Sequence, residues 1–175
     1  MNYYMDFEFH EYKNSRGVNT IEPISMGLVR EDGKSLYILF DDFDMWRAWG
    51  NTWLRENVFK TIAEEHEVDL ENPMQFEEVF DTSQAEAALR ILSFIGEDKS
   101  PKFHVFYGDY DWVVFCWLFG RMIDLPKHFP YYAIDLKQEM DRLGMEDLED
   151  DGKHSALGDA FYIMEMHKLV IKNDN

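Results

Sequence analysis

The acidic residues nearest the N-terminus have a spacing that suits metal binding. Asp6 and Glu8 lie two residues apart in the aromatic stretch from Met1 to His10, which has the composition of a β-strand. Side chains at positions i and i+2 of a strand share a face, so these carboxylates and Tyr4 project together. Adjacent carboxylates repel each other unless a cation lies between them, and hard divalent cations prefer oxygen ligands. The pair therefore predicts a divalent metal site, and an ordinary solvent-facing strand edge is the alternative.

A second acidic motif lies in the middle of the chain. Residues 107–112 (Tyr-Gly-Asp-Tyr-Asp-Trp) follow a predicted strand and pass through a glycine into a helix. Helix N-termini collect Asp as capping residues, so we expect Asp109 to cap this helix. Asp111 is expected to point across toward the first strand, and Asp109 is the alternative for that role.

A third motif lies near the C-terminus. His154 is expected on the loop before the last helix, and Asp159 a turn inside that helix. Taken singly, His154 has the pattern of a surface loop histidine and Asp159 that of an ordinary helical acid. A functional role for His154 and Asp159 is indicated only by their position in the chain after the two earlier acidic motifs.

The whole-chain composition limits the class of protein. The 175 residues are long enough for one domain with a buried core, and 46% of them are hydrophobic, which excludes a disordered chain. No apolar run approaches a membrane span, the N-terminus lacks a signal-peptide pattern, and the single Cys116 excludes an internal disulfide. We therefore expect a single domain over residues 1–175 in the cytoplasm, with no membrane partner.

The net charge of −18 bears on nucleic-acid partners. Proteins that hold long nucleic acids neutralise many phosphates and are usually basic, so this chain should not coat DNA or RNA. Processing of a short end remains compatible with the charge if metal ions supply positive charge at the reacting phosphate. The acidity also contributes to solubility.

The patterning along the chain predicts an α/β fold with one mixed sheet flanked by helices. Asp32-Gly33 marks a hairpin, and Ser83 with Glu86 forms a capping box at the start of a helix. Strands are expected at residues 1–10, 21–30, 35–40, 102–107 and 132–134. Helices are expected at residues 83–95, 110–122, 135–143 and 155–171, and residues 43–62 are expected to be irregular at first and then helical. Residues 64–80 are acidic, contain Pro73 and give no clear prediction; residues 146–152 are expected to form an acidic loop.

Taken together, the motifs resemble the DEDDh 3′–5′ exonucleases, the superfamily of ribonuclease T, oligoribonuclease and polymerase proofreading domains. The resemblance spans Asp6 to Ala160 and favours the small single-domain exoribonuclease branch. Its matching stretches are Asp6-x-Glu8, residues 24–29 (ISMGLV), 107–112 (YGDYDW), 135–138 (DLKQ) and 154–160 (HSALGDA). Each motif is weak alone, and their common order is more specific. The resemblance implies a ribonuclease H-like fold, in which an antiparallel β-meander is followed by parallel strands.

The resemblance also implies roles for five residues. Asp6, Glu8, Asp111 and Asp159 would bind two Mg²⁺ or Mn²⁺ ions, which would activate water and stabilise the leaving 3′-oxygen. His154 would act as the general base. The implied activity is a 3′–5′ exoribonuclease that releases nucleoside 5′-monophosphates from short single-stranded RNA or 3′ overhangs.

The chain departs from the family pattern at Phe7, where many members carry a small hydroxyl residue. The usual side-chain contact to the terminal sugar is then absent, so recognition of the 3′ end must rely on other groups. Phe9, Tyr110 and Trp112 are candidates for stacking on bases, together with the Phe7 position itself. Burial in the core is the competing interpretation, above all for Phe9 and Trp112.

Two further hypotheses stay open. One is a 3′–5′ exodeoxyribonuclease with the same chemistry, since the sequence exposes no contact that would select a 2′-hydroxyl. The other is a ribonuclease H-like binding or adaptor protein. In that case Trp46, Trp49 and Trp53 would form a docking surface. The same tryptophans are alternatively a homodimer contact or part of the core.

Overall fold

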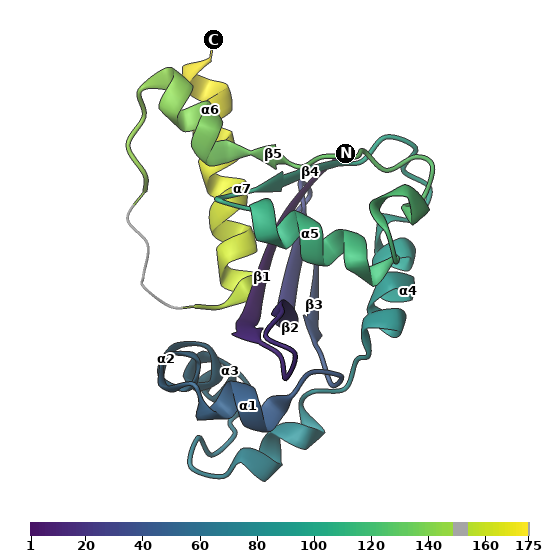
Figure 1. Cartoon of the computed structure of the whole chain (residues 1–175). Helices are drawn as coiled ribbons and strands as arrows, with labels where there is room; N and C mark the ends of the chain where they lie inside the picture. The colour runs from purple at the N-terminus through teal and green to yellow at the C-terminus, as the bar shows by residue number, and fades with distance from the viewer. Residues whose placement is uncertain (149–153, 175) are drawn as a thin grey trace.

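The fold is built on one five-stranded mixed sheet. We describe a computed structural model, which covers residues 1–148 and 154–174. The strand order is β3-β2-β1-β4-β5, and β1 lies at the centre (Figure 1). The strands are β1 (Asn2–Lys13), β2 (Asn19–Arg30), β3 (Ser35–Leu39), β4 (Lys102–Val105) and β5 (Ile134–Asp135). The first three are antiparallel and β4 and β5 are parallel to β1, which confirms the predicted mixed sheet.

Helices cover both faces of the sheet. Side chains alternate along β1, so this strand contributes to a separate core on each face. Met5 and Phe7 belong to the large core that also holds α4 (Gln84–Ile95) and α5 (Asp109–Leu118). Tyr4 belongs to a second core with α6 (Leu136–Leu143) and α7 (Ala156–Asn173). Asp6 and Glu8 therefore lie on the face that α7 covers.

The segment after β3 forms a lobe at the end of the sheet (Figure 1). It consists of α1 (Met45–Gly50), α2 (Thr52–Leu54), a π-helical turn (Arg55–Phe59), α3 (Lys60–His66) and a 3₁₀ helix (Pro73–Glu78). Trp49 packs edge-on against Phe59 in its aromatic interior, whereas Trp46 and Trp53 are 59% and 51% exposed. Trp49 therefore packs against the core, whereas Trp46 and Trp53 lie on the surface of the lobe.

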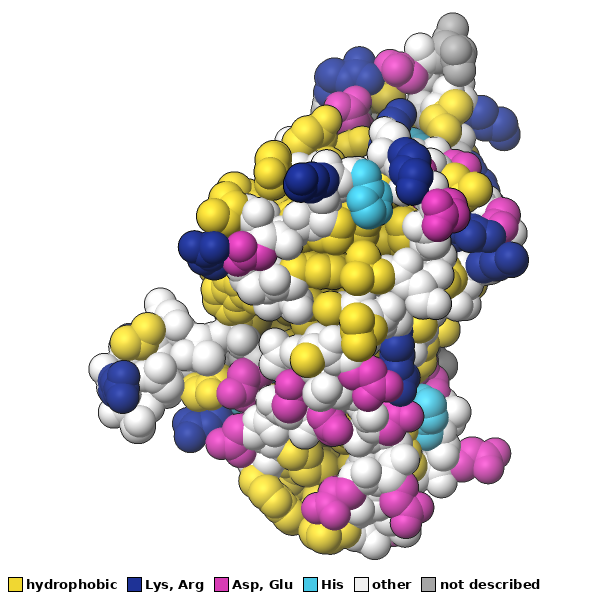
Figure 2. Space-filling model, turned by 90° about the vertical axis from the view of Figure 1, so that its right-hand side faces the viewer, with side chains coloured by type: hydrophobic (Ala, Val, Ile, Leu, Met, Phe, Trp, Pro, Cys, Tyr) yellow, Lys and Arg dark blue, Asp and Glu magenta, His cyan; other side chains and the backbone are white. Residues whose placement is uncertain are grey.

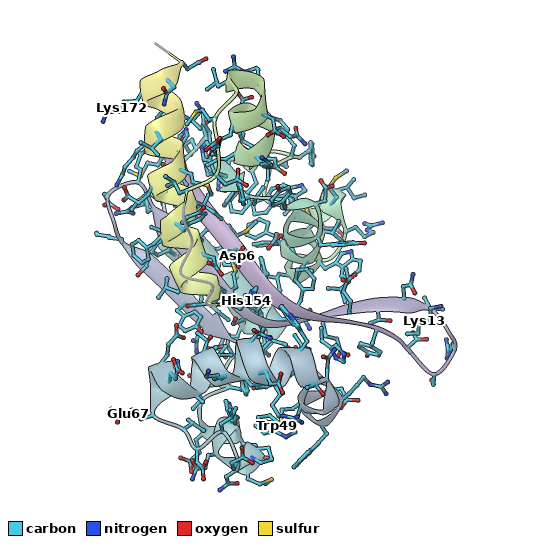
Figure 3. The ribbon with its side chains drawn as sticks, turned by 90° about the vertical axis from the view of Figure 1, so that its left-hand side faces the viewer. Asp6, Lys13, Trp49, Glu67, His154 and Lys172 are labelled. Atoms are coloured by element: carbon cyan, nitrogen blue, oxygen red, sulfur yellow. The ribbon has the colours of Figure 1, made fainter. Side chains whose placement is uncertain are left out.

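The strands β1 and β2 extend well beyond the rest of the sheet. β4 pairs with β1 only from Asn2 to Tyr4, and β3 pairs with β2 only from Ser25 to Val29. Residues 9–22 consequently form a two-stranded projection, which we call the arm, and Lys13 lies near its tip (Figure 3). Beyond Tyr4, no strand among the described residues pairs with the edge of β1 that faces α5.

Several boundaries differ from the sequence prediction. The first strand runs to Lys13 and the second begins at Asn19, and the segment expected to be helical up to residue 62 continues to His66. The helix expected at 110–122 is α5, which ends at Leu118 because Gly120 adopts a φ of 108°; a 3₁₀ turn (Met122–Asp124) follows. The strand expected to reach residue 107 ends at Val105, and the strand expected at 132–134 is shifted to Ile134–Asp135. Asp109 does not cap α5 with its side chain: Gly108 occupies the capping position, so that prediction was wrong.

The surface is divided by charge. On the face shown in Figure 2, acidic side chains gather in the lower part, at the level of the lobe, and hydrophobic side chains gather above them. The acidic excess on this face would repel a polyanion there.

Among the described residues, no helix is long and apolar enough to cross a membrane. Cys116 is a buried free thiol.

Candidate active site

Three carboxylates from two elements meet at one point beside the central strand. Oxygen atoms of Asp6 and Glu8 on β1 and of Asp159 on α7 all lie within 4.8 Å of one another. Glu8 is 8% exposed. Carboxylate oxygens at this spacing are the donor set that Mg²⁺ or Mn²⁺ prefers, so these residues fit a divalent cation.

Gly27 allows α7 to approach the sheet at this point. Gly27 pairs with Asp6 across the β1–β2 ladder, and a Cβ atom added to it would overlap the carbonyl group of Ala156 at the start of α7. Only a glycine leaves room for the helix backbone here. The close contact brings the first turns of α7, and with them Asp159, against β1.

Asp111 joins the site from α5. Its side chain is 8% exposed, and Oδ1 accepts a hydrogen bond of 2.8 Å from the backbone N–H of Phe7, the residue between Asp6 and Glu8. Asp109, two residues earlier, is exposed. Of the two candidates, Asp111 is therefore the one directed toward β1, although it lies outside the mutual 4.8 Å set.

The carboxylates perturb one another strongly. Burial, and then the charges of Asp111, Glu8 and Asp159, raise the pKa of Asp6 well above its usual value. Burial raises the pKa of Asp111 to about 6, against the opposing effect of the hydrogen bond from Phe7. Negative charges gathered out of water are costly without a counterion. A bound cation would remove this cost, which is a second reason why these residues fit a metal.

His154 lies at the edge of the cluster. Its Nδ1 is 3.6 Å from Oε1 of Glu8, and its ring contacts Trp53 of α2 edge-on, with 4.7 Å between the ring centroids. The His154 side chain is 41% exposed, so solvent reaches it. It lies between the start of α7 and the lobe (Figure 3). The lobe thus contributes Trp53 to the surroundings of His154, a placement that the sequence did not indicate.

Glu65 of α3 ties the lobe to the start of α7. Its carboxylate accepts a hydrogen bond of 2.6 Å from the Ser155 hydroxyl and one of 2.9 Å from the Tyr37 hydroxyl. Ser155 also caps α7 by accepting from the N–H of Gly158. Because Ser155 directly follows His154, this bridge fixes the backbone next to the histidine. Sequence reasoning missed Glu65, since an acid in an acidic helix gives no local signal.

Two pockets of similar size flank the carboxylates. One, of about 420 Å³, contains Asp6, Asp159, His154 and Tyr107 in its lining. The other, of about 380 Å³, is lined by residues 7–11 of β1 and by Asn51, Trp53 and Leu54. Tyr107 is 65% exposed and has a φ of 55°, an uncommon conformation that turns the chain sharply between β4 and α5. Both volumes fall in the range of small-ligand sites.

The four aromatic residues proposed for base stacking have different surroundings. The ring of Phe7 is buried and stacks on Phe40, so only its backbone is available at the pocket. Trp112 stacks on Phe115 in the core. Phe9 is partly buried and contacts Tyr110 edge-on, and Tyr110 is 51% exposed. Tyr110 is therefore the most accessible of the four.

Comparison with known proteins gives one similarity in sequence and one in structure. No protein-family model matches the chain. A 3′–5′ exoribonuclease of Mycobacterium tuberculosis, from strains CDC 1551 and H37Rv, is 28% identical over 179 residues. These cover 100% of this chain and 96% of the relative. A chain in the structure of the yeast NOT1 MIF4G domain co-crystallized with CAF1 aligns with a TM-score of 0.51 and 14% identity. That alignment covers 99% of this chain and 79% of the other. The structural likeness concerns the α/β fold alone, and the sequence similarity supports a 3′–5′ exonuclease activity.

Proposed function

We propose that the protein is a metal-dependent 3′–5′ exoribonuclease of the DEDDh class with a ribonuclease H-like fold. The observation that carries the proposal is the meeting of Asp6, Glu8 and Asp159 within 4.8 Å, with His154 at 3.6 Å from Glu8. The similarity to a 3′–5′ exoribonuclease over the whole chain supports the same activity. Hydrolysis would release nucleoside 5′-monophosphates one at a time from the 3′ end.

Asp6, Glu8, Asp159 and Asp111 would hold two Mg²⁺ or Mn²⁺ ions. When bound, such ions activate a water molecule and stabilise the developing charge on the leaving oxygen. The four carboxylates contribute four negative charges, which two divalent ions balance. Burial, and then repulsion between the carboxylates, raises the pKa of Asp6 and brings that of Asp111 to about 6, and bound ions would offset both costs.

His154 would accept the proton from the attacking water. The water oxygen forms a bond to phosphorus, the bond from phosphorus to the 3′-oxygen of the preceding nucleotide breaks, and that oxygen leaves and is protonated. Glu8, at 3.6 Å, and the edge-on Trp53 limit the orientations of the imidazole. The exposure of His154 lets it exchange its proton with solvent after each cycle.

The charge of the chain favours short substrates. A net charge of −18 opposes the approach of long polyanions, whereas a short single strand presents few phosphates outside the neutralised site. Short single-stranded RNA and single-stranded 3′ overhangs are accordingly the proposed substrates.

The test is digestion of matched single-stranded RNA and DNA, labelled at the 5′ end, with Mg²⁺, with Mn²⁺ and with EDTA. We expect a metal-dependent ladder that shortens from the 3′ end, with 5′-monophosphates as product and RNA cleaved faster than DNA. Faster cleavage of DNA would instead favour the exodeoxyribonuclease. Absence of shortening on both substrates would contradict the enzyme and favour the binding protein.

A further inference from the structure

A groove separates the arm from α5, away from the carboxylate cluster. It has a volume of about 470 Å³, and its lining includes Tyr12, Lys13, Asn19 and Thr20 of the arm and Tyr110 and Trp117 of α5. Tyr110 and Trp117 are 51% and 52% exposed. These two large aromatic side chains lie seven residues apart on one helix and line an open groove, so they offer flat surfaces for stacking.

The groove is continuous with the candidate active site along β1. Glu8 belongs to the carboxylate cluster, Phe9 contacts Tyr110 edge-on, and Glu11 lines both the groove and the pocket beside Glu8. The edge of β1 has no strand partner in this stretch, because pairing with β4 ends at Tyr4. A chain molecule can therefore run from the cluster into the groove without crossing a paired strand.

The tip of the arm carries positive charge in a strongly acidic protein, whereas the whole arm balances Lys13 and Arg16 against Glu11 and Glu22. Lys13 lines the groove and Arg16 lies on the turn of the arm, and residues 12–21 contain no Asp or Glu. Glu11 is the acidic residue of the groove lining. Cations combined with exposed aromatic rings suit single-stranded nucleic acid, whose bases stack and whose phosphates need neutralisation.

We propose that this groove binds the single-stranded RNA upstream of the scissile 3′ end. Bases stack on Trp117 and Tyr110, and Lys13 and Arg16 neutralise phosphates. The inference rests on the proposed function and adds a substrate preference to it. From Glu8 to Lys13 the strand spans about 17 Å. A dinucleotide held at the cluster ends before the far part of the groove, where Lys13 and Trp117 lie, whereas a strand of about ten nucleotides fills it.

The experiment compares RNA lengths in the full-length protein. Initial rates with Mg²⁺ are measured on a dinucleotide and on a ten-nucleotide single-stranded RNA, for the wild type, for Trp117→Ala and for the double variant Lys13→Gln with Arg16→Gln. Loss of one stacking contact should lower kcat/KM on the decamer about tenfold, through KM, relative to the dinucleotide. The double variant should also reduce the dependence of log(1/KM) on log salt by about 1.4, because two phosphate contacts to a single strand are lost.

The matched controls lie outside the groove. Trp46→Ala removes a tryptophan of similar exposure from α1, and Lys99→Gln with Lys102→Gln removes two cations near the far end of the sheet. Both controls should leave the ratio of decamer to dinucleotide rates unchanged. The groove proposal would be overturned if Trp117→Ala lowered kcat/KM equally on the decamer and the dinucleotide. It would also be overturned if the controls changed the ratio of the two rates as much as the groove variants do.

Two further results separate this inference from its alternatives. Light scattering gives the molar mass of the wild type and of Trp117→Ala; a dimer that becomes a monomer would assign the surface to contact between copies and overturn the proposal. If the wild type hydrolyses neither RNA, the proposed function fails. RNA binding in EDTA, followed by fluorescence anisotropy of the labelled decamer, then tests the groove by itself: unweakened binding to Trp117→Ala would overturn it.

Discussion

The backbone N–H of Phe7 donates a hydrogen bond of 2.8 Å to the carboxylate of Asp111, 104 residues later in the chain. The bond joins the central strand β1 to the N-terminal turn of α5, and it holds Asp111 next to the residues on either side of Phe7. Burial nevertheless raises the pKa of Asp111 to about 6, so one hydrogen bond does not offset the loss of solvation. This carboxylate is positioned at a cost in stability, as expected for a site that needs its charge.

Replacing Asp111 with Asn should stabilise the metal-free protein. Without metal, the folded state binds more protons at Asp111 than the unfolded state between about pH 4 and 6, so the free energy of unfolding falls as pH rises through this window. Asn keeps an acceptor for the N–H of Phe7 and removes the charge. In EDTA at pH 7 we expect the variant to be more stable by about 1–3 kcal/mol, and near pH 4 the two proteins should converge. Urea unfolding across this pH range measures the difference.

When Mg²⁺ or Mn²⁺ is added, the stability difference caused by Asp111→Asn should shrink or change sign. The wild type should gain stability from the metal, and Asp111→Asn should gain less and lose most of its nuclease activity. Asp109→Asn is the matched control, since Asp109 is exposed two residues earlier on the same helix, and it should change neither property. If Asp109→Asn lost more activity and more metal-induced stability than Asp111→Asn, Asp109 would be the metal ligand instead.

Asp159→Asn should abolish both metal binding and activity while the fold remains intact. Its oxygen lies within 4.8 Å of those of Asp6 and Glu8, so the variant removes one of three converging charges. We expect nucleotide release to fall about a thousandfold or more, with unchanged circular dichroism and weaker metal binding by calorimetry. Glu165→Gln on the exposed part of α7, where Glu165 pairs with Lys168, is the control and should be active. Full activity in Asp159→Asn would refute the site.

Glu65 is predicted to position His154 through Ser155. Glu65→Ala removes the hydrogen bonds from Ser155 and Tyr37, which frees the backbone beside the histidine. We expect kcat to fall about tenfold with little change in KM or in metal-induced stabilisation, because the carboxylate cluster is untouched. Glu65→Gln, which can still bond both hydroxyls, should restore most of the rate, and Glu56→Ala, at an exposed position of the same lobe, should have little effect. A parallel loss of metal binding in Glu65→Ala would show a general structural role instead.

Gly27→Ala should destabilise the protein more than an ordinary glycine substitution. The added Cβ would overlap the Ala156 carbonyl, so α7 must move away from β2 and carry Asp159 with it. We expect a loss of about 3 kcal/mol in the free energy of unfolding, together with reduced activity. Gly50→Ala at the end of α1 is the control, because a Cβ there meets no atom within 4 Å. Equal stability of the two variants by thermal unfolding would contradict the tight packing of α7 on the sheet.

Most of the fold could be predicted from local patterns. The alternation in residues 1–10, the hairpin signal at Asp32-Gly33 and the capping box at Ser83 all lie on the elements they predicted. Boundaries were less accurate where the backbone turns sharply, as at Tyr107 and Gly120. Both residues adopt positive φ angles. Gly120 does so readily because it has no Cβ atom, whereas at Tyr107 the packing around the turn imposes an uncommon conformation. The expected acidic loop at 146–152 lies partly outside the described residues.

The sequence by itself determined the types and order of the site residues and the strand that places Asp6 and Glu8 on one face. Only the tertiary structure decided that Asp111 rather than Asp109 faces β1, that Phe7 and Trp112 are core residues, and that Glu65 and Trp53 reach the start of α7. Spacing along a strand or helix fixes a face, since backbone geometry sets the period of the side chains. Contacts between residues a hundred positions apart depend on how whole elements pack, and that packing is set by the combined burial of many side chains.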